Sequence, residues 1–435
     1  MTWSGKNTTR RAPAAITPIL RHAPELGLKA LSLLWPPNAA VTARNVISLR
    51  RTEPWLAEAA AGTDERLLGS LDAALAWLCR SQDAVGSGGI GCFEFYRWTQ
   101  GYPEVTGYVV PTFWDCATAL DRPGLAERAV RMTDWELEIQ RADGGWGGGY
   151  DGDRHPTVVF NTGQVLRGLL RSYAETKDQR YLDAAARGGS WIVANQEPDG
   201  SWARANFKGM RRVYDSYVSA PLARLAQITG DDRYRDAALR NCAFVISNQR
   251  ENGWFENADN SPYFNDAPVT HTICYTIAGL IETGELLGEQ GFVDAGRRAA
   301  DGMVGSLDEW PLLYGRLGSS WEPRTGFACL TGAAQFGLVC MRLHALTGDR
   351  RYVETARKLL GFLVWTQRLN GVGGNRRGAI AGSFPIWGLY CPLKYPSWAT
   401  KYFADLTLAV LEAGKLDELP QDDGGIGYAE GVAIS

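Results

Sequence analysis

The sequence predicts an all-α protein, an (α/α)6 toroid of six helical hairpins, and three observations support this prediction. A segment of about 57 residues recurs six times between residues 62 and 416. Each copy reads as an amphipathic helix followed by a more apolar one, and strand patterns are few. The end copies are degenerate but lack the polar face of capping repeats, so we expect the six units to close into a ring.

The repeat is clearest in three copies that align without gaps. In each copy a Tyr stands fifteen residues before a Gln, and small residues and an Arg follow the Tyr; the pairs are Tyr181 and Gln196, Tyr234 and Gln249, and Tyr352 and Gln367. Weaker copies begin at Leu67, Leu125 and Phe292, so successive anchors lie 58, 56, 53, 58 and 60 residues apart. This spacing predicts one domain over residues 62–416 rather than the several that 435 residues would otherwise suggest.

The first helix of each unit ends in a glycine-rich loop that carries Gln and Trp. The loop reads QRADGGW from Gln140 to Trp146 and QEPDGSW from Gln196 to Trp202, with a shorter version ending at Trp254. A Gln at a helix end can bond the free backbone groups there, and a Trp can cover them. We therefore expect these side chains to fasten neighbouring hairpins to one another.

The second helices are apolar nearly all round, which predicts that they form the buried layer inside an outer layer of alanine-striped first helices. Turns such as Thr229-Gly230-Asp231 separate the units, with Gly suited to a helix C-cap and Asp to the next start. The expected inner segments are 162–174, 216–229, 270–287, 332–347 and 398–413.

The Gln and Trp loops resemble the QW motif of squalene-hopene cyclases and prenyltransferase-type toroids. The stretches 101–108 and 381–390, with 395–401, resemble bacterial prenyltransferase-repeat proteins associated with exopolysaccharide synthesis. The resemblance implies a six-hairpin toroid, a fold that also hosts glycoside hydrolases, polysaccharide lyases and uronate epimerases. It says little about chemistry, because a fold does not determine a function.

The N-terminal segment differs in charge from the rest of the chain. Residues 1–60 carry eight basic and three acidic side chains, whereas the whole chain has a net charge of −3. A chain with this net charge lacks the overall positive potential that attracts nucleic acid. We expect residues 1–61 to form a basic helical extension packed on the toroid and 417–435 to form a tail. No signal-peptide pattern occurs, which predicts a cytoplasmic protein. Residues 13–35 are the candidate for peripheral contact with the inner face of a membrane.

Neither a cofactor nor a metal site is expected. The eight cysteines are never closer than eleven residues, so zinc-ribbon and redox motifs are absent, and buried, reduced thiols are expected. His271 and Cys274 lie three residues apart, but no second Cys motif accompanies them.

Chemistry is expected where the N-termini of the inner helices converge on a central cavity. Helix N-termini favour anionic or polyhydroxylated ligands, and the variable loops that lead into these helices carry acids, bases and aromatic residues. The candidate catalytic residues are Glu104, Tyr108, His155, Asp215 and His271, with Glu104 expected just before the first inner helix. The candidate substrate-binding residues are Tyr96, Trp98, Arg154, Tyr214, Tyr275, Trp321, Glu322, Arg377, Trp387, Tyr395, Trp398 and Lys401.

These residues together predict an enzyme that acts on an acidic poly- or oligosaccharide, since aromatic platforms and Arg or Lys suit sugar faces and carboxylates. A glycoside hydrolase would pair Glu104 with Asp151, Asp153, Asp215 or Glu322. A lyase or C5-epimerase would instead use His271, His155, Tyr108 or Tyr214 as base, with Arg154 or Arg377 on the uronate. The sequence does not decide between these two.

Two other classes remain open. An isoprenoid cyclase needs a D-x-D-D acid, and the run Asp151-Gly-Asp153-Arg154 is one carboxylate short of it. A non-catalytic toroid that binds a glycan or a partner enzyme is the other alternative. The residues that line the cavity would discriminate between a sugar enzyme and an isoprenoid cyclase. Carboxylates and stacking aromatic rings favour sugar chemistry, whereas a closed apolar chamber favours isoprenoids.

Overall fold

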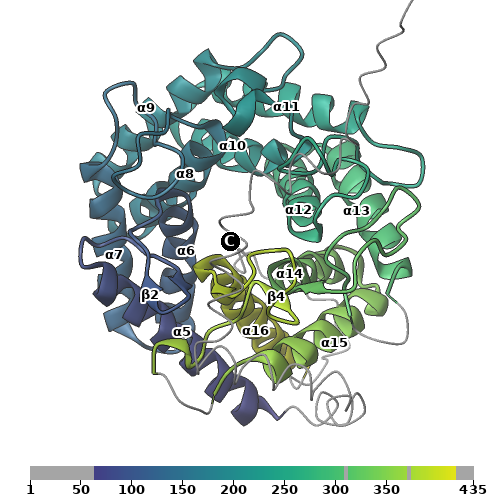
Figure 1. Ribbon diagram of the computed structural model, residues 1–435. Helices are drawn as coiled ribbons and strands as arrows, with labels where there is room; N and C mark the ends of the chain where they lie inside the picture. The colour runs from purple at the N-terminus through teal and green to yellow at the C-terminus, as the bar shows by residue number, and fades with distance from the viewer. Residues whose placement is uncertain (1–62, 308–311, 370–373, 418–435) are drawn as a thin grey trace, which may run out of the picture.

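The computed structural model describes residues 63–307, 312–369 and 374–417. The basic extension, the tail and the candidate membrane contact at 13–35 lie outside these residues. In the described part, twelve α-helices alternate between an outer and an inner layer around one axis (Figure 1). The predicted toroid of six hairpins is therefore confirmed. No helix among the described residues is long and apolar enough to cross a membrane.

The outer helices coincide with the alanine-striped first helices of the repeat. Their bounds are α5 Asp64–Val85, α7 Pro123–Glu138, α9 Gln179–Ala194, α11 Asp232–Ser247, α13 Gln290–Gly305 and α15 Arg350–Thr366. The inner helices are α6 Pro103–Ala119, α8 Val159–Thr176, α10 Ser216–Thr229, α12 Thr270–Leu287, α14 Leu330–Thr347 and α16 Ser397–Asp417. Each inner helix contacts the next, and α16 packs on both α5 and α6, which closes the ring.

Helix α6 begins earlier than the sequence predicts. We placed Glu104 just before this helix, but Pro103 occupies its first turn and Glu104 follows inside it. Proline lacks an N–H and has a φ suited to the first helical position, so the helix can start there.

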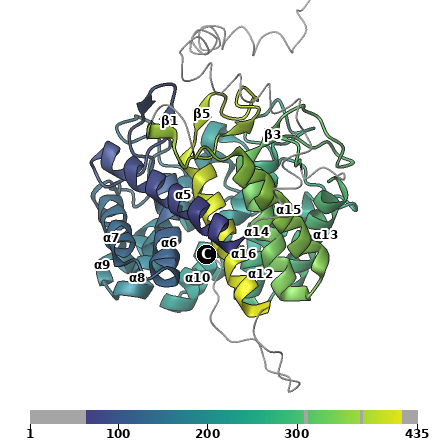
Figure 2. The ribbon, with the colours of Figure 1, turned by 90° about the horizontal axis from the view of Figure 1, so that it is seen from below.

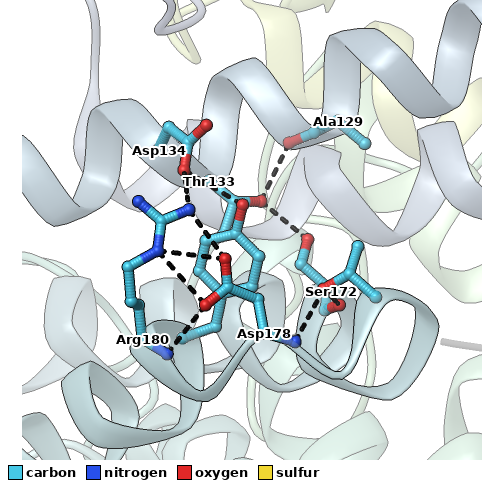
Figure 3. A network of polar contacts seen from close by, with 8 residues as sticks. Ala129, Thr133, Asp134, Ser172, Asp178 and Arg180 are labelled. Carbon is cyan, nitrogen blue, oxygen red and sulfur yellow. Dashed lines mark hydrogen bonds and ion pairs between the residues drawn. The ribbon is translucent and has the colours of Figure 1, made fainter.

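Residues at the start of α9 connect this helix to the preceding outer helix, α7. Asp178 caps α9 through the backbone N–H of Arg180, and Arg180 reaches Asp134 on α7 (Figure 3). In the same view Thr133 of α7 bonds Ser172 of α8, 2.7 Å away. The hydroxyl of Tyr181 also donates to Asp134, at 3.0 Å.

The predicted role of the Gln and Trp loops as fasteners is confirmed. Gln140 donates to the backbone oxygen of Ala184 on the next outer helix at 2.9 Å, and Arg187 donates back to the Gln140 amide oxygen. Gln367 donates in the same way to Ser70 at 2.9 Å, which joins the last unit to the first. The buried Trp146 indole donates to Glu136 at the end of its own outer helix.

The strands are two-residue pieces in the loops that lead into the inner helices. Strand β1 (Phe93–Glu94) pairs with β2 (Arg97–Trp98) and with β5 (Lys394–Tyr395), and β3 (Ala328–Cys329) pairs with β4 (Ser383–Phe384). Figure 2 shows β1, β3 and β5 together at one end of the ring. The antiparallel pairing of β1 with β5 connects the first and sixth loops there.

Candidate functional site

A pocket of about 470 Å³ lies where the loops enter the inner helices. The first turns of α6, α8, α12 and α16 contribute to its lining, together with the loops before α8, α10, α12 and α16. Its volume falls in the range of small-molecule sites. The predicted cavity at the N-termini of the inner helices is present, with most of the ring contributing to it.

Aromatic side chains form one wall of the pocket. The Tyr102 ring lies 5.3 Å from Tyr150 and 6.2 Å from Trp398, centroid to centroid. The Trp398 indole donates to the hydroxyl of Tyr390 at 2.8 Å, which holds both rings in place. Such rings offer flat apolar faces with polar edges, as sugar binding requires.

A second group of rings lies at the base of the pocket. Phe160 contacts Tyr214 and Tyr275, with centroid separations of 5.1 and 5.0 Å. Tyr275 in turn packs on Tyr217, and the predicted catalytic residue Tyr108 is buried beside Tyr402. These rings fill the middle of the toroid, so Tyr108 belongs to the packed layer under the pocket.

Glu104 is a carboxylic acid in the pocket wall. Burial raises its pKa to about 7, although the Tyr102 hydroxyl, which donates to it at 2.9 Å, acts in the opposite direction. The carboxyl faces the cavity from the first turn of α6. A group with this pKa is partly protonated at neutral pH and can donate a proton.

His271 enters the pocket from α12 and is fixed from behind. Its Nδ1 lies 2.5 Å from the amide oxygen of Gln335 on α14, and its ring packs at a tilt on Tyr275, with 4.4 Å between the ring centroids. Burial lowers the pKa of His271 to about 4, so the imidazole is neutral at physiological pH.

Asp153 and His155 lie together on the loop before α8. Gly149, with φ +80°, turns the chain there, and a Cβ at this residue would lie 2.5 Å from the Asp153 carboxylate and 2.8 Å from the His155 ring. The backbone N–H of Tyr150 donates to Asp153 at 2.8 Å. Only glycine fits this turn with both side chains folded over it.

Lys394 joins three loops at the edge of the pocket. Its ammonium group lies 3.0 Å from the Glu94 carboxylate and donates to the Tyr150 hydroxyl at 2.6 Å. It is the single lysine or arginine among the described lining residues. Glu94 neutralises this charge locally.

Asp215 supports the site from behind instead of lining it. It is fully buried and accepts from the Asn206 amide at 2.7 Å, and Asn206 lines the pocket. Burial raises the pKa of Asp215 to about 8, against the opposing effects of Arg212 and Asn206. Asp215 is therefore held as a neutral acid that orients Asn206.

The structure brings only some of the predicted residues together. Those that line the pocket are Glu104, His155, Tyr214, His271, Tyr275 and Trp398. Asp215 and Tyr108 lie immediately behind it. The remaining nine lie outside the lining, namely Tyr96, Trp98, Arg154, Trp321, Glu322, Arg377, Trp387, Tyr395 and Lys401.

Several of these nine have structural contacts. Trp321 is buried and donates to the backbone of Asn252, like the Trp residues of the repeat loops. Trp98 packs 5.2 Å from Trp77, and Lys401 pairs with Asp405 at 2.6 Å. Tyr395 is buried on β5.

The others lie nearer the surface. Glu322 pairs with Arg324 at 2.6 Å, whereas Tyr96, Arg154 and Arg377 are exposed. Trp387 is half-buried against the core.

Sequence reasoning missed several lining residues. Tyr102, Phe160, Asn206, Asn260 and Lys394 are polar or aromatic residues near the start of an inner helix or in the loop before it. Tyr102 and Lys394 each stand within four residues of a predicted site residue, so proximity to the helix start would have identified them. The asparagines carry no local pattern, because the folding of two long loops positions them.

Among the described residues, no group of three His, Cys, Asp or Glu side chains is placed to hold a metal ion. The polar groups of the pocket are carboxyls, imidazoles, amides, hydroxyls and one ammonium. This set suits acid–base chemistry and hydrogen bonding to hydroxyl groups.

No protein-family model and no curated protein matches the chain. Solved structures do match. An unsaturated glucuronyl hydrolase specific for heparin is similar with a TM-score of 0.65 and 15% identity, over 82% of this chain and 99% of that one. The unsaturated glucuronyl hydrolase of Bacillus sp. GL1 is similar with a TM-score of 0.64 and 14% identity, over 81% and 97%.

The cellobiose 2-epimerase of Bacillus thermoamylovorans B4167 is similar with a TM-score of 0.65 and 10% identity, over 80% of this chain and 99% of that one. At these identities the likeness establishes the fold alone. The chain is thus an (α/α)6 toroid that resembles sugar hydrolases and sugar epimerases.

Proposed function

We propose that the protein is a glycoside hydrolase in which Glu104 is the general acid. The observation that carries this proposal is a carboxyl group whose pKa burial raises to about 7, placed in an aromatic-walled pocket. Such a group can give a proton to a leaving glycosidic oxygen near neutral pH. The fold likeness to sugar hydrolases agrees with this assignment.

In the proposed reaction Glu104 donates its proton to the bridging oxygen as the bond from that oxygen to the anomeric carbon breaks. A water molecule supplies the hydroxyl that the anomeric carbon gains. Asp153, the other carboxyl that lines the pocket, accepts the proton released by that water. Tyr102 and Trp398 hold the sugar faces, and the lining asparagines bond its hydroxyls.

Three of the four residues expected as the base of a lyase or C5-epimerase are less suited to proton abstraction. With a pKa near 4, His271 is a weak proton acceptor. Burial raises the pKa of Tyr214, and it raises the pKa of Tyr108 well above its usual value, so both phenols keep their protons. These pKa values disfavour three of the four candidate bases and leave His155, which lines the pocket, as the base that a lyase or epimerase would use.

The charge of the lining favours a neutral sugar over the acidic one expected from the sequence. Arg154 and Arg377, the predicted partners of a uronate, lie outside the lining, and Glu94 already pairs with Lys394. Asn161, Asn206 and Asn260 instead offer neutral amides to hydroxyl groups. The same polar groups disfavour an isoprenoid, which would require an apolar chamber.

A product screen tests the proposal. Purified protein is incubated with neutral and uronate-containing oligosaccharides, and new reducing ends, ultraviolet absorbance of unsaturated products and epimers by NMR are followed. We expect new reducing ends without ultraviolet absorbance of unsaturated products, and Glu104→Gln should lower the rate of their formation by about a hundredfold or more. Glu322→Gln, an exposed carboxylate outside the pocket, is the matched control and should leave the rate unchanged.

Unsaturated products formed together with the new reducing ends, as β-elimination by a lyase gives, would contradict the hydrolase assignment, and so would epimers without new reducing ends. Equal rates for wild type and Glu104→Gln would contradict the role of Glu104.

A further inference from the structure

The pocket is closed along the side formed by the loops of the first, second and sixth units. Strand β1 pairs with β5, and Lys394 bonds both Glu94 and Tyr150. The backbone N–H of Asp151 also donates to the oxygen of Gly101, at 2.7 Å. Hydrogen bonds between loops therefore make this side a continuous wall.

The loop before α12 has a different character. Asn260 of this loop lines the pocket, and three and four residues farther on Tyr263 and Phe264 are 63% and 45% exposed. Two neighbouring exposed aromatic side chains beside a pocket are the kind of apolar surface that ligand-binding grooves present. The guanidinium of Arg316 lies 4.2 Å from the centre of the Phe264 ring and stacks on it.

Buried charged groups hold this loop in position. Asp259, which is fully buried, accepts from Arg316 at 2.7 Å and from the backbone N–H groups of Ser261 and Val269. Arg212, also fully buried, donates to the backbone oxygens of Asp259 and Asn260, at 2.5 and 3.1 Å. The turn that carries the two aromatic rings is thus built on buried ion-pair and backbone contacts.

We propose that Tyr263 and Phe264 form an outer saccharide subsite, over which the unreacted part of an oligosaccharide chain leaves the pocket. This inference rests on the proposed function and specifies its substrate as a chain longer than the pocket holds. Asn260 places the loop before α12 at the pocket, and the exposed rings follow three and four residues later on the same loop. Sugar rings stack on exposed aromatic faces of this kind.

The test compares glycans of different length on a printed array that carries neutral and acidic oligosaccharides from disaccharides to octasaccharides. Wild type should bind long chains more tightly than the matching disaccharides. The double variant Tyr263→Ala/Phe264→Ala should lose about tenfold in affinity for the long chains and keep its affinity for the disaccharides.

The control is Ile228→Ala/Leu346→Ala, which removes two exposed apolar side chains from the C-terminal turns of α10 and α14. Its affinities should equal those of wild type at every length, and thermal unfolding should confirm that both double variants fold.

Three outcomes would overturn the inference. Wild type that binds disaccharides and octasaccharides equally has no outer subsite. A Tyr263→Ala/Phe264→Ala variant that binds long chains like wild type shows that the subsite lies elsewhere. Loss of affinity at all lengths would place these rings in the support of the pocket itself. In each of these three cases saccharides still bind, so the proposed function survives; failure to bind any glycan would overturn both.

Discussion

At the scale of single residues, burial separates the roles of the ionisable groups. Glu104 and Asp215 are both acids with raised pKa values, but only Glu104 lines the pocket. His271 has a lowered pKa and is held by Gln335. The sequence predicted all three as catalytic candidates, because residue type and position are visible in it. It could not distinguish them, since burial and distance from the pocket depend on the folding of the loops.

Asp215 should make the stability of the protein depend on pH. Its folded pKa of about 8 lies above the value of about 4 in an unfolded chain, so its contribution is present below pH 4 and is lost as pH rises through 8. In the Asp215→Asn variant the side chain at this position is an amide, which does not ionise. Its Tm should therefore fall less than that of wild type between pH 6 and pH 9, by about 2 °C or more.

Differential scanning fluorimetry across this pH range measures the effect, with Asp151→Asn as an exposed control that should follow wild type. A parallel decline of Asp215→Asn and wild type would show that Asp215 is ionised in the folded protein.

At the scale of elements, the repeat in the sequence determined most of what could be predicted. Gln196 bonds Ala237 on the next outer helix, and Tyr181, fifteen residues earlier, bonds Asp134 on the preceding one, so the Tyr-to-Gln spacing marks both contacts of the helix. Helix starts were less predictable, as α6 shows, since Pro103 begins the helix before its apolar periodicity does. The short strands, including β1 and β5, have no pattern of their own because tertiary contacts alone pair them.

Gln140→Ala should lower the free energy of unfolding by about 1–3 kcal/mol, because it removes two partly buried hydrogen bonds from the Gln140 amide to the backbone oxygens of Gly144 and Ala184. Denaturant unfolding followed by circular dichroism measures this loss. Gln179→Ala removes an exposed Gln of α9 and should change stability by less than about 0.5 kcal/mol. An equal effect of the two substitutions would contradict the fastening role of the repeat Gln.

At the scale of the whole molecule, the ring is closed by contacts between residues far apart in sequence. Gln367 bonds Ser70, the Trp77 indole donates to Asn375, and α16 packs on α5. The number of repeats and the absence of polar end copies predicted this closure. The sequence did not predict which loops would form the pocket: Trp321 of the fifth loop was an expected binding residue, and it is instead buried in packing.

In a closed ring, losing a hydrogen bond between the last and first units should lower stability as much as losing one between any other two neighbouring units. Gln367→Ala, at the junction of the last and first units, should therefore cost about as much stability as Gln140→Ala, again about 1–3 kcal/mol. The end units of an open stack would fray independently, so Gln367→Ala would then leave the main unfolding transition unchanged. Urea unfolding of both variants under the same conditions discriminates the two cases.

The central claim is that a protonated Glu104 drives sugar hydrolysis in this pocket. The most direct measurement is the pH dependence of kcat/KM for wild type and Glu104→Gln on the same oligosaccharide. Because the pKa of Glu104 is about 7 and the general acid must carry its proton, wild-type kcat/KM should fall as pH rises through 7. Glu104→Gln should show a low rate without that decline. A Glu104→Gln enzyme with the wild-type rate and the same pH profile would contradict the claim.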